Sequence, residues 1–295
     1  MKIKTRVRSA ILRWYRRNRR DLPWRRTGDP YRILVSEVML QQTQVSRVLQ
    51  KYPLFLKRFP TLTKLAKSSR ADVIRAWRGM GYNNRAVRLR QLAGTVSENF
   101  DGQIPASIDK LMSLPGIGRY TAHAVACFAF DHRVPVVDTN IQRVLGRLFN
   151  NRKENVWHIA ARILPKKHTY EWNQALMEFG AVICTARAPR CGECPVRREC
   201  PSAFRAEIRT SLKNTNEPGR YGVPNRIYRG KVVEILRSMN GRKSISSSAV
   251  VRGLIPRFSK KDHRWFTKLL EGLRRDGLIS MKKQASGYLL SLPNS

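Results

Sequence analysis

The chain has 295 residues, enough for about two or three domains, and its 42% hydrophobic content is that of an ordinary globular protein. Its 58 Lys and Arg residues against 20 Asp and Glu residues give a formal net charge of +38, which indicates a polyanionic binding partner. Nucleic acid fits better than a membrane, since there is no run of eighteen apolar residues and no lipidation motif. The basic first twenty residues lack the apolar core of a signal peptide, so we expect a reducing, cytoplasmic environment in which the five cysteines are metal ligands or core thiols rather than disulfides.

The chain begins with a predicted amphipathic helix over residues 6–17, in which Val7 and Ile11 recur at helical spacing. Residues 22–30 are rich in proline and glycine and predict a loop, whose last residue, a proline, suits the first turn of a second helix. Short helices punctuated by glycine and proline follow, and residues 134–137 are the one β-rich run in this part of the sequence. The body of the protein is therefore predicted to be all-α.

The second helix carries a polar stretch, residues 36–45, inside an otherwise apolar helical run. At 100° per residue, Glu37 and Gln41 fall beside Val38 and Val45 on or near the apolar stripe, so a carboxylate is directed toward the protein interior. The positions three and four residues to either side of it hold no Lys or Arg. A buried carboxyl group keeps its proton more readily than an exposed one and could act as an acid. The alternative is a buried carboxylate paired with a distant arginine, and this stretch alone favours that alternative.

A tight glycine turn at residues 114–118 separates two predicted helices. These helices span residues 107–113 and 119–130. Because Gly116 and Gly118 have no Cβ atoms, backbone N–H groups can approach an anion, and the following helix brings its positive N-terminus and Arg119 to the same place. An ordinary αα-hairpin is the structural alternative, and the basic charge of the chain favours a site for a DNA phosphate.

Asp138 comes just before a predicted helix whose apolar positions are 141, 144, 145 and 148. Aspartate is a strong N-cap residue, so capping alone would explain it. A capping carboxylate is also fixed in place and kept ionised by the backbone donors and the helix dipole beside it. Asp138 could therefore cap the helix and serve a site at once.

Four cysteines form the strongest chemical signature in the sequence, with the spacing Cys-x6-Cys-x2-Cys-x5-Cys. They are Cys184, Cys191, Cys194 and Cys200. Four thiols in one short segment can bind a single centre, either a [4Fe–4S] cluster or a tetrahedral zinc ion. Zinc sites more often show two separated Cys-x2-Cys pairs, so the spacing favours the cluster. The fifth cysteine, Cys127, lies in an apolar run and is predicted to be a core residue.

A polar segment rich in Asn, Gly and Pro predicts a linker at residues 206–223, followed by a second domain at residues 224–295. The expected elements there are helices over 227–238, 247–253 and 260–276 and strands over 278–281 and 288–292. Three helices followed by a basic hairpin indicate a winged helix-turn-helix module. In the third helix Trp265, Leu269 and Leu273 would turn inward, opposite a basic stripe. The stripe consists of Lys261, Arg264, Lys268 and Arg275, and it could enter a DNA groove or be a solvated face.

Together these motifs resemble those of the helix-hairpin-helix DNA glycosylases, and within that group the MutY-type adenine DNA glycosylases. The resemblance covers residues 1–205. Its motifs, in order, are Leu22-Pro23-Trp24, residues 36–43, Gly79-Met80-Gly81-Tyr82, residues 114–118, residues 137–140 and the four-cysteine loop. The resemblance implies an all-α, two-lobed fold followed by the winged-helix-like domain. One lobe, residues 1–22 and 133–205, would hold the [4Fe–4S] cluster, and the other, residues 23–132, would hold the helix-hairpin-helix.

The family's chemistry implies roles for particular residues. Glu37 would protonate the adenine ring and later activate water, while Asp138, with Asn140 beside it, would stabilise the oxocarbenium-like sugar; two carboxylates with separated pKa values suit cleavage of a glycosidic bond. The base must first be rotated out of the duplex. The residues implied to fill the vacated stack or to line the base pocket are Trp24, Arg25, Gln41, Gln42 and Tyr82. Tyr120 stands where lyase-competent relatives carry a nucleophilic lysine, which implies a monofunctional enzyme in which Tyr120 shapes the pocket.

The chain departs from the family pattern in three places. Asn83 and Asn84 follow Tyr82, where a second tyrosine is usual, and Thr139 replaces a glycine. Residues 224–295 are too short for the Nudix-like domain with which typical members inspect 8-oxoguanine.

The sequence therefore predicts a monofunctional glycosylase of base excision repair. It would remove adenine mispaired with 8-oxoguanine or guanine, acting as a monomer on duplex DNA in the cytoplasm, at the nucleoid, with a [4Fe–4S] cluster in a structural and DNA-positioning role. The alternatives are a thymine glycosylase for G·T mispairs on the same scaffold and a non-catalytic DNA-binding regulator. The regulator would need neither Glu37 nor Asp138.

Overall fold

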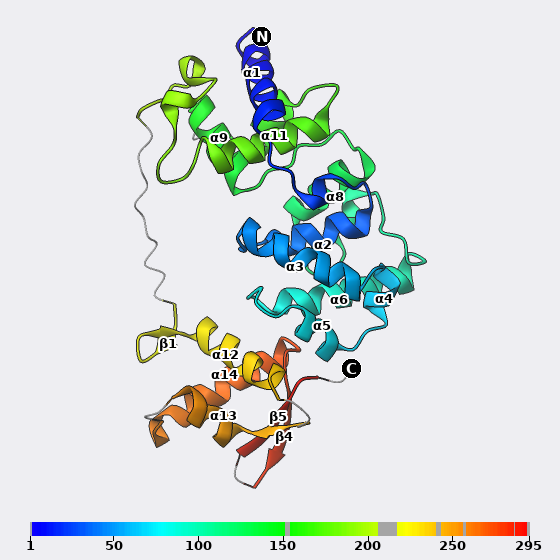
Figure 1. The fold of residues 1–295 in the computed structure, drawn as a ribbon, viewed down its shortest axis with the longest axis vertical. Helices are drawn as coiled ribbons and strands as arrows, with labels where there is room; N and C mark the ends of the chain where they lie inside the picture. Colours follow the sequence, from blue (N-terminus) through cyan, green and yellow to red (C-terminus); the bar gives the residue numbers. More distant parts are fainter. Residues whose placement is uncertain are drawn as a thin grey trace. The chain divides into compact units, whose positions relative to one another are not determined.

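The computed structural model of the protein (Figure 1) describes residues 2–150, 154–205, 217–239, 243–255, 258–285 and 287–293, with side chains described from residue 5 onward. These residues form two compact units. The first unit comprises Met1–Leu34, Pro105–Ser113 and Ile117–Lys213, and the second comprises Val35–Ile104, Leu114–Gly116 and Asn214–Ser295. The units differ from the expected domains, because residues 117–132 group with the first unit and the C-terminal domain groups with the second. Every helix in the described ranges is too short or too polar to span a lipid bilayer.

The first unit is a bundle of helices around α11. It contains α1 (Lys2–Asn18), the 3-10 turn η1 (Pro23–Arg25), α7 (Ile108–Met112), α8 (Arg119–Phe130), α9 (Thr139–Phe149), α10 (Val156–Ile163) and α11 (Thr169–Val182). α11 packs against α1, α8 and α9 (Figure 1). The apolar stripes of these helices meet in a core in which Ile11, Leu145 and Trp172 are buried. The helices predicted at residues 6–17 and 119–130 are confirmed.

The β-rich run at residues 134–137 forms no strand, in agreement with the predicted all-α body. The side chain of Asn173, on α11, takes the place of a neighbouring strand. Its Oδ1 accepts a hydrogen bond from the backbone N–H of Val136 (3.1 Å), and its Nδ2 donates to the carbonyl oxygen of Val134 (3.0 Å). The same amide also contacts the sulfur of Cys127, which is buried in the core as predicted and whose pKa burial raises to about 11.

The second unit begins inside α2 (Pro30–Leu40) and continues with four more helices. They are α3 (Val45–Arg58), α4 (Leu62–Ala66), α5 (Arg70–Ala76) and α6 (Asn84–Asn99). α6 packs against α4 and α5, and α3 packs against α5. Phe55 and Trp77 meet edge to face in the interior, with ring centroids 5.7 Å apart.

The polar stretch at residues 36–45 is not one continuous helix. α2 ends at Leu40 and α3 begins at Val45, with a turn between them in which Gln42 has a left-handed backbone (φ 53°). Gln41 therefore does not share a helical stripe with Val45, and that expectation was wrong. The expected burial of Glu37, which stays within α2, is confirmed.

The C-terminal residues form a winged helix-turn-helix module, which confirms the predicted fold class. Its elements are β1 (Gly219–Arg220), β2 (Val223–Pro224), α12 (Asn225–Arg237), β3 (Ile245–Ser246), α13 (Ser247–Leu254), η4 (Lys260–Asp262), α14 (His263–Arg275), β4 (Ser280–Gln284) and β5 (Gly287–Ser291). The antiparallel sheet has the order β3-β5-β4, with Leu290 opposite both Ile245 and Met281. The sequence did not predict β3. Residues 219–223, expected in the linker, form a small hairpin with Pro224 instead, and residues 206–216 lie outside the described residues.

The winged-helix module shares a hydrophobic core with α5 and α6, since Ile74 and Val87 pack in the same cluster as its own apolar residues. Arg237 of α12 reinforces this joint from a nearly buried position, with 4% of its side chain exposed. Its Nε donates to the carbonyl oxygen of Ile74 (2.9 Å), and its Nη2 donates to Oδ1 of Asn83 (2.8 Å). Asn83, one of the departures from the family pattern, thus serves to attach the module to the loop before α6.

Candidate functional site

Glu37 lies in the part of α2 that belongs to the second unit, and only 5% of the residue is exposed. Its neighbours along the chain are buried as well, with Ser36 1% and Val38 6% exposed. α2 is apolar on most of its surface, so packing holds the carboxyl group in place. A carboxyl group shielded from bulk water in this way can keep a proton for delivery to a substrate.

Arg85, in the first turns of α6, holds the C-terminal end of α2. Its Nη1 donates to the carbonyl oxygens of Val38 (2.8 Å), Met39 (2.9 Å) and Gln41. The last carbonyl groups of a helix have no partners within the helix and carry the negative end of its dipole, so a guanidinium group satisfies both needs. Burial lowers the pKa of Arg85 to about 10, which leaves it protonated at neutral pH. This cation is the reason why α2 can end at Leu40.

The same guanidinium group holds the loop that precedes α6. Its Nη2 donates to the carbonyl oxygens of Met80 (3.1 Å) and Gly81 (3.2 Å) and to the hydroxyl group of Thr43 (2.9 Å). The indole Nε1 of Trp77 donates to the carbonyl oxygen of Gly81 as well (3.1 Å). Arg85 therefore ties the turn after α2 to the loop before α6.

Gln42 and Tyr82, the residues predicted to fill the space left by an extruded base, lie on these two tethered segments. Both have left-handed backbone conformations, with φ of 53° and 42°. A residue with a Cβ atom adopts this conformation at a cost of about 1–2 kcal/mol. Both side chains are exposed, Tyr82 to 48%. The second unit thus presents two exposed side chains on loops that one buried arginine holds in strained conformations.

Arg85 was not among the residues expected from the sequence, although helical periodicity marks it. It stands four residues before Leu89 and seven before Leu92, on the apolar stripe of α6. Only 7% of the residue is exposed. An arginine on an apolar stripe is the same kind of signal that singled out Glu37.

Asp138 is the N-cap residue of α9, as predicted. Its Oδ1 accepts a hydrogen bond from the backbone N–H of Ile141 (2.7 Å), and its Oδ2 accepts one from Nδ2 of Asn140 (2.9 Å). Burial raises the pKa of Asp138 and outweighs these hydrogen bonds and the nearby charge of Arg143, which act in the opposite direction. The expectation from capping considered only the groups that favour ionisation. The hydrogen-bond donors fix the position of the carboxyl group, and burial decides the direction in which its pKa shifts.

Arg143, which was not predicted, supports this cap from one turn along α9. Its Nη2 donates to Oδ1 of Asn140 (2.7 Å) and to the carbonyl oxygen of Gly180 (2.7 Å), and its Nε donates to the carbonyl oxygen of Cys184 (2.8 Å). A Cβ atom at Gly180 would lie 2.7 Å from that of Asn140, so the glycine permits the close approach of α9 and α11. A continuous set of hydrogen bonds therefore runs from Asp138 to the backbone of the first cysteine of the four-cysteine loop.

The glycine turn connects α7 to α8, as predicted. Gly116 has a φ of +79°, which favours glycine, whereas Gly118 has an ordinary φ and no described atom lies within 4 Å of where its Cβ atom would be. The N-terminus of α8 is therefore open in front of Gly118. Arg119 lies over the ring of Trp157 at 4.0 Å, and Tyr120 is half-buried in the first turn of α8. Binding of a phosphate at this turn stays a prediction.

Trp24 is buried within η1, and Arg25 beside it lies in an ion pair. Nη2 of Arg25 is 2.7 Å from Oε2 of Glu178, and its Nε donates to Oε1 of Gln174 (2.8 Å). Burial opposes the ionisation of Glu178, but hydrogen bonds and charge from Arg20 and Arg25 outweigh it and lower the pKa of this carboxyl group. The structure thus gives Arg25 a place in the interior of the first unit, and its contribution to a base pocket stays a prediction.

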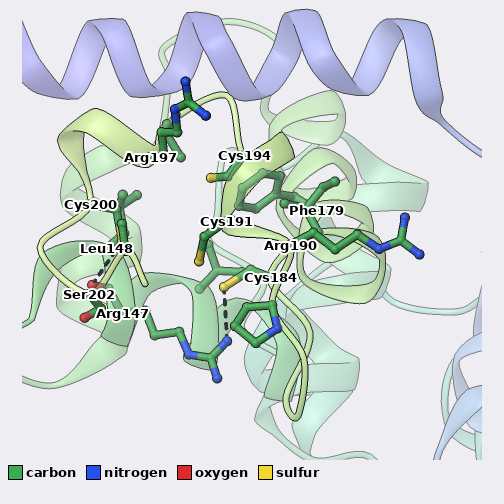
Figure 2. Close-up of a pocket in the computed structure, with 15 residues that line it drawn as sticks. Arg147, Leu148, Phe179, Cys184, Arg190, Cys191, Cys194, Arg197, Cys200 and Ser202 are labelled. Atoms are coloured by element: carbon green, nitrogen blue, oxygen red, sulfur yellow. Dashed lines mark hydrogen bonds between the residues drawn. The ribbon is translucent and has the colours of Figure 1, made fainter. Parts of the chain in front are cut away.

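The four cysteines line one cavity, together with apolar side chains from α9, α11 and the loop itself. Figure 2 shows the sulfur atoms of Cys184, Cys191 and Cys194 turned into the same space. The loop follows α11 and is shaped by two short 3-10 turns, η2 (Cys191–Glu193) and η3 (Arg197–Glu199). Nη1 of Arg147 lies 3.4 Å from the sulfur of Cys184. The outer surface of the loop carries the exposed side chains of Arg187, Arg190, Arg197 and Arg198.

The chemistry of this cavity suits a positively charged metal centre. Burial, with the neighbouring thiols, raises the pKa of Cys194 to about 11, and burial also raises the pKa of Cys200. Thiolates in such a place need cationic partners, and ligation by metal supplies them. Among the described residues no three His, Cys, Asp or Glu side chains are grouped closely enough to hold a single metal ion.

The predicted site residues are divided between the two units. The second unit contains Glu37, Gln41, Gln42, Tyr82 and Gly116, and the first contains Trp24, Arg25, Gly118, Arg119, Tyr120, Asp138, Asn140 and the four cysteines. Within the second unit the structure brings together the segments that carry Gln42 and Tyr82. Within the first it connects Asp138 and Asn140 to the cysteine loop.

Comparison with known proteins gives this arrangement a context. Residues 35–166 match a family described as HhH-GPD superfamily base excision DNA repair protein. Residues 184–200 match the iron-sulfur binding domain of endonuclease III, which confirms the predicted iron–sulfur cofactor rather than zinc.

Curated relatives and a solved structure extend the similarity. The chain is 39% identical over 276 residues to the adenine DNA glycosylase of Mycolicibacterium smegmatis, covering 91% of each chain. It is 48% identical over 195 residues to the adenine DNA glycosylase of Mycobacterium tuberculosis, covering 63% of this chain and 64% of that protein. A structure described as a thermostable thymine-DNA glycosylase is similar with a TM-score of 0.66 and 32% identity, covering 69% of this chain and 98% of that one.

Proposed function

Because the chain belongs to the HhH-GPD superfamily of base excision DNA repair proteins, we propose that it is a monofunctional DNA glycosylase that removes adenine mispaired with 8-oxoguanine or guanine from duplex DNA. The observation that carries the choice of adenine is the 39% identity to the adenine DNA glycosylase of M. smegmatis over 91% of this chain. The part of the chain outside this alignment is shorter than the winged-helix module, so the alignment extends from the helical body into the module.

The proposed reaction is hydrolysis of the bond between adenine and C1′ of its deoxyribose. Glu37 donates its proton to the adenine ring as the bond breaks, and its carboxylate then accepts a proton from the water that adds to C1′. The products are free adenine and an abasic site. The burial of Glu37 supports this role, because the carboxyl group is shielded from bulk water, with 5% of the residue exposed.

Asp138 has the complementary task of stabilising positive charge on the sugar. Its carboxylate is fixed by Ile141 and Asn140, and burial makes its interaction with a nearby cation stronger than it would be in water. Asn140 is itself held by Arg143, so the oxygen atoms of Asp138 need no reorganisation during the reaction.

The target base must leave the stack before these groups can act on it. Tyr82 and Gln42, exposed on the segments that Arg85 ties together, are proposed to enter the space that the base vacates. Tyr120 cannot form a Schiff base with the opened sugar, because it has no amine, which supports a glycosylase without lyase activity.

The four cysteines would hold the iron–sulfur cluster, which folds the loop and positions its exposed arginines for DNA. Hydrolysis of a glycosidic bond transfers no electrons, so the cluster supplies no step of the chemistry. We further expect the protein to act as a monomer in the cytoplasm, at the nucleoid.

A thymine glycosylase acting on G·T mispairs is the second candidate. It is favoured by the similarity to the thermostable thymine-DNA glycosylase, with 32% identity. The two candidates differ in the base that is excised, so a panel of duplexes containing A·8-oxoguanine, A·G or G·T distinguishes them under single-turnover conditions. Release of thymine but not adenine would overturn the main proposal, and tight binding without release of any base would identify a non-catalytic DNA-binding protein.

The role of Glu37 is tested by Glu37→Gln in the same assay. Loss of a general acid is expected to slow adenine release by about 10²–10⁴-fold while DNA affinity changes little. Glu98→Gln, at an exposed position of α6 in the same unit, is the matched control and should excise at the wild-type rate. Excision by Glu37→Gln at the wild-type rate would remove this residue from the mechanism.

A further inference from the structure

The winged-helix module leaves one face of its recognition helix uncovered. The contacts that attach the module to α5 and α6 come from Arg237 on α12, from Gly277 next to Val87, and from Pro293, whose carbonyl oxygen accepts a hydrogen bond from the N–H of Ala71 (3.0 Å). α14 turns its apolar residues into the module's own core. The opposite face of α14 takes no part in this attachment.

That face is strongly basic. Its exposed side chains are Lys261, at the start of the helix, and Arg264, Lys268, Arg274 and Arg275 along it. Strand β4 pairs with β5 to form the wing (Figure 1). It adds exposed Lys282 and Lys283. These seven side chains are called the α14–wing face below.

The carboxylates of the module do not neutralise this face. The described part of the module contains five, and four of them pair with arginines elsewhere: Glu217 with Arg226, Glu234 with Arg78, Asp262 with Arg220, and Asp276 with Arg229. Glu271 is the one carboxylate among the exposed residues of α14. The α14–wing face therefore carries seven exposed basic side chains, and the exposed Lys231, Lys243, Arg252 and Lys260 of the module lie outside this set.

The start of α14 is also held firmly. Asp262, which is fully buried, accepts hydrogen bonds from the backbone N–H of Ser259 (2.9 Å), the hydroxyl group of Tyr221 (2.7 Å) and Nε of Arg220 (2.6 Å). Ser259 and Asp262 form a capping box at this point. In helix-turn-helix proteins the N-terminal residues of the second helix approach the base edges, so this is the end of the helix that needs a fixed position.

We propose that the α14–wing face is a second binding surface for duplex DNA, with α14 in the major groove and the wing against the phosphate backbone. The charge complements a polyanion, and an exposed helix beside a two-stranded wing has the shape of a groove-binding module. Among the described residues of α14, β4 and β5 there is no large exposed apolar side chain of the kind that anchors a protein partner or enters a membrane. Duplex DNA is therefore the occupant that both charge and shape favour.

This surface belongs to the same compact unit as the loop that carries Tyr82. A duplex long enough to reach both would gain affinity from two linked contacts, while a short duplex would engage only one. The proposal does not depend on which base is excised, because binding is measured without catalysis.

The test is equilibrium binding of the full chain to a fluorescently labelled, fully paired duplex of about 30 base pairs and to one of about 12, roughly one helical turn. The variant is Lys261→Ala with Arg264→Ala and Lys268→Ala. The matched control removes the same charge from exposed lysines of the helical body in the same unit. It is Lys57→Ala with Lys64→Ala and Lys67→Ala.

The expected result follows from counterion release. Each lost phosphate contact lowers the salt slope by about 0.9 and, at 0.15 M salt, the affinity by about fivefold, or roughly a hundredfold for three contacts. We expect this loss for the long duplex only, with unchanged affinity for the short duplex and with wild-type binding by the control. Unchanged binding of the long duplex by the α14 variant would overturn the proposal, and so would equal losses in both triple variants.

A second measurement is independent of the substitutions. In the wild-type protein, the long duplex should protect Lys261, Lys268 and Lys282 from acetylation, read residue by residue by mass spectrometry. Lys57 and Lys64 should react at the same rate with and without DNA. Acetylation of Lys261 and Lys268 at undiminished rates in the presence of saturating DNA would also overturn the proposal.

Discussion

Replacing Arg85 with methionine is expected to release the two segments that carry Gln42 and Tyr82. Methionine has a similar length and fits an apolar stripe, but it donates no hydrogen bond. Arg85 donates to six carbonyl groups and one hydroxyl group, all of them buried or partly buried. A hydrogen bond from a charged donor contributes about 1.5–3 kcal/mol, but one side chain makes all seven and the contributions are not additive. We expect the free energy that holds these two segments in place to fall by about 3–5 kcal/mol, as it does when one partner is removed from a buried charged network.

Hydrogen exchange measured by mass spectrometry is the appropriate assay, because the effect should be local before it is global. Peptides covering residues 40–44 and 79–83 should exchange about 10²- to 4 × 10³-fold faster in Arg85→Met, since every 1.4 kcal/mol is a factor of ten. The single-turnover rate of base excision should fall as well, because Gln42 and Tyr82 lose the strained backbone conformations in which they are presented.

Two further variants test whether the hydrogen bonds of the guanidinium group cause this effect. Arg85→Lys keeps the charge but cannot reach both sets of carbonyl groups, so its exchange rates should be intermediate. Arg88→Met, at an exposed position of the same helix, should resemble the wild type. If Arg85→Met exchanges and excises like Arg88→Met, the guanidinium group does not hold these loops and the reasoning is refuted.

Three more predictions follow from the first unit. Asn140→Ala removes a hydrogen bond that lowers the pKa of Asp138, so the pKa of Asp138 should rise further. Because excision needs the carboxylate, the acid limb of the pH–rate profile should then move to higher pH. An unmoved limb would mean that this carboxylate does not limit the rate. Gly180→Ala places a Cβ atom against Asn140 and should lower the free energy of unfolding by about 1–3 kcal/mol, as measured by urea denaturation, with Gly146→Ala, where the space is open, as the control. Cys191→Ser should yield protein without the broad visible absorption of an iron–sulfur cluster and with little bound iron, whereas Cys127→Ser, in the core, should keep both; full iron content in Cys191→Ser would exclude this thiol as a ligand.

Much of the helical body was predictable because its signals are local. Periodicity over three or four residues located α8 at Arg119–Phe130, and a capping aspartate located the start of α9. The four cysteines lie within seventeen residues of one another, so their spacing alone indicated one metal centre. The burial of Glu37 followed in the same way from the apolar residues beside it in α2.

The end of α2 shows where local signals fail. Helical periodicity places Val38 and Val45 on one stripe, yet α2 ends at Leu40, where Arg85, more than forty residues away in sequence, binds its last carbonyl groups. The β-rich run at residues 134–137 forms no strand, and Asn173 of α11 makes hydrogen bonds with its backbone instead. In both cases a distant side chain completes hydrogen bonds that the segment itself cannot make.

What the sequence by itself determined is which residues are buried along each helix, where the metal ligands lie and which chemical groups are available. Those properties depend on neighbours within a few positions. Only the tertiary structure decided that Arg85 joins two loops, that Arg143 holds Asn140 beside Asp138, and that Asn83 accepts a hydrogen bond from Arg237. It also decided that burial raises the pKa of Asp138 despite its capping donors. The physical reason is that a buried polar group takes its partners, and its loss of water, from whatever the fold brings against it, and sequence distance places no limit on that.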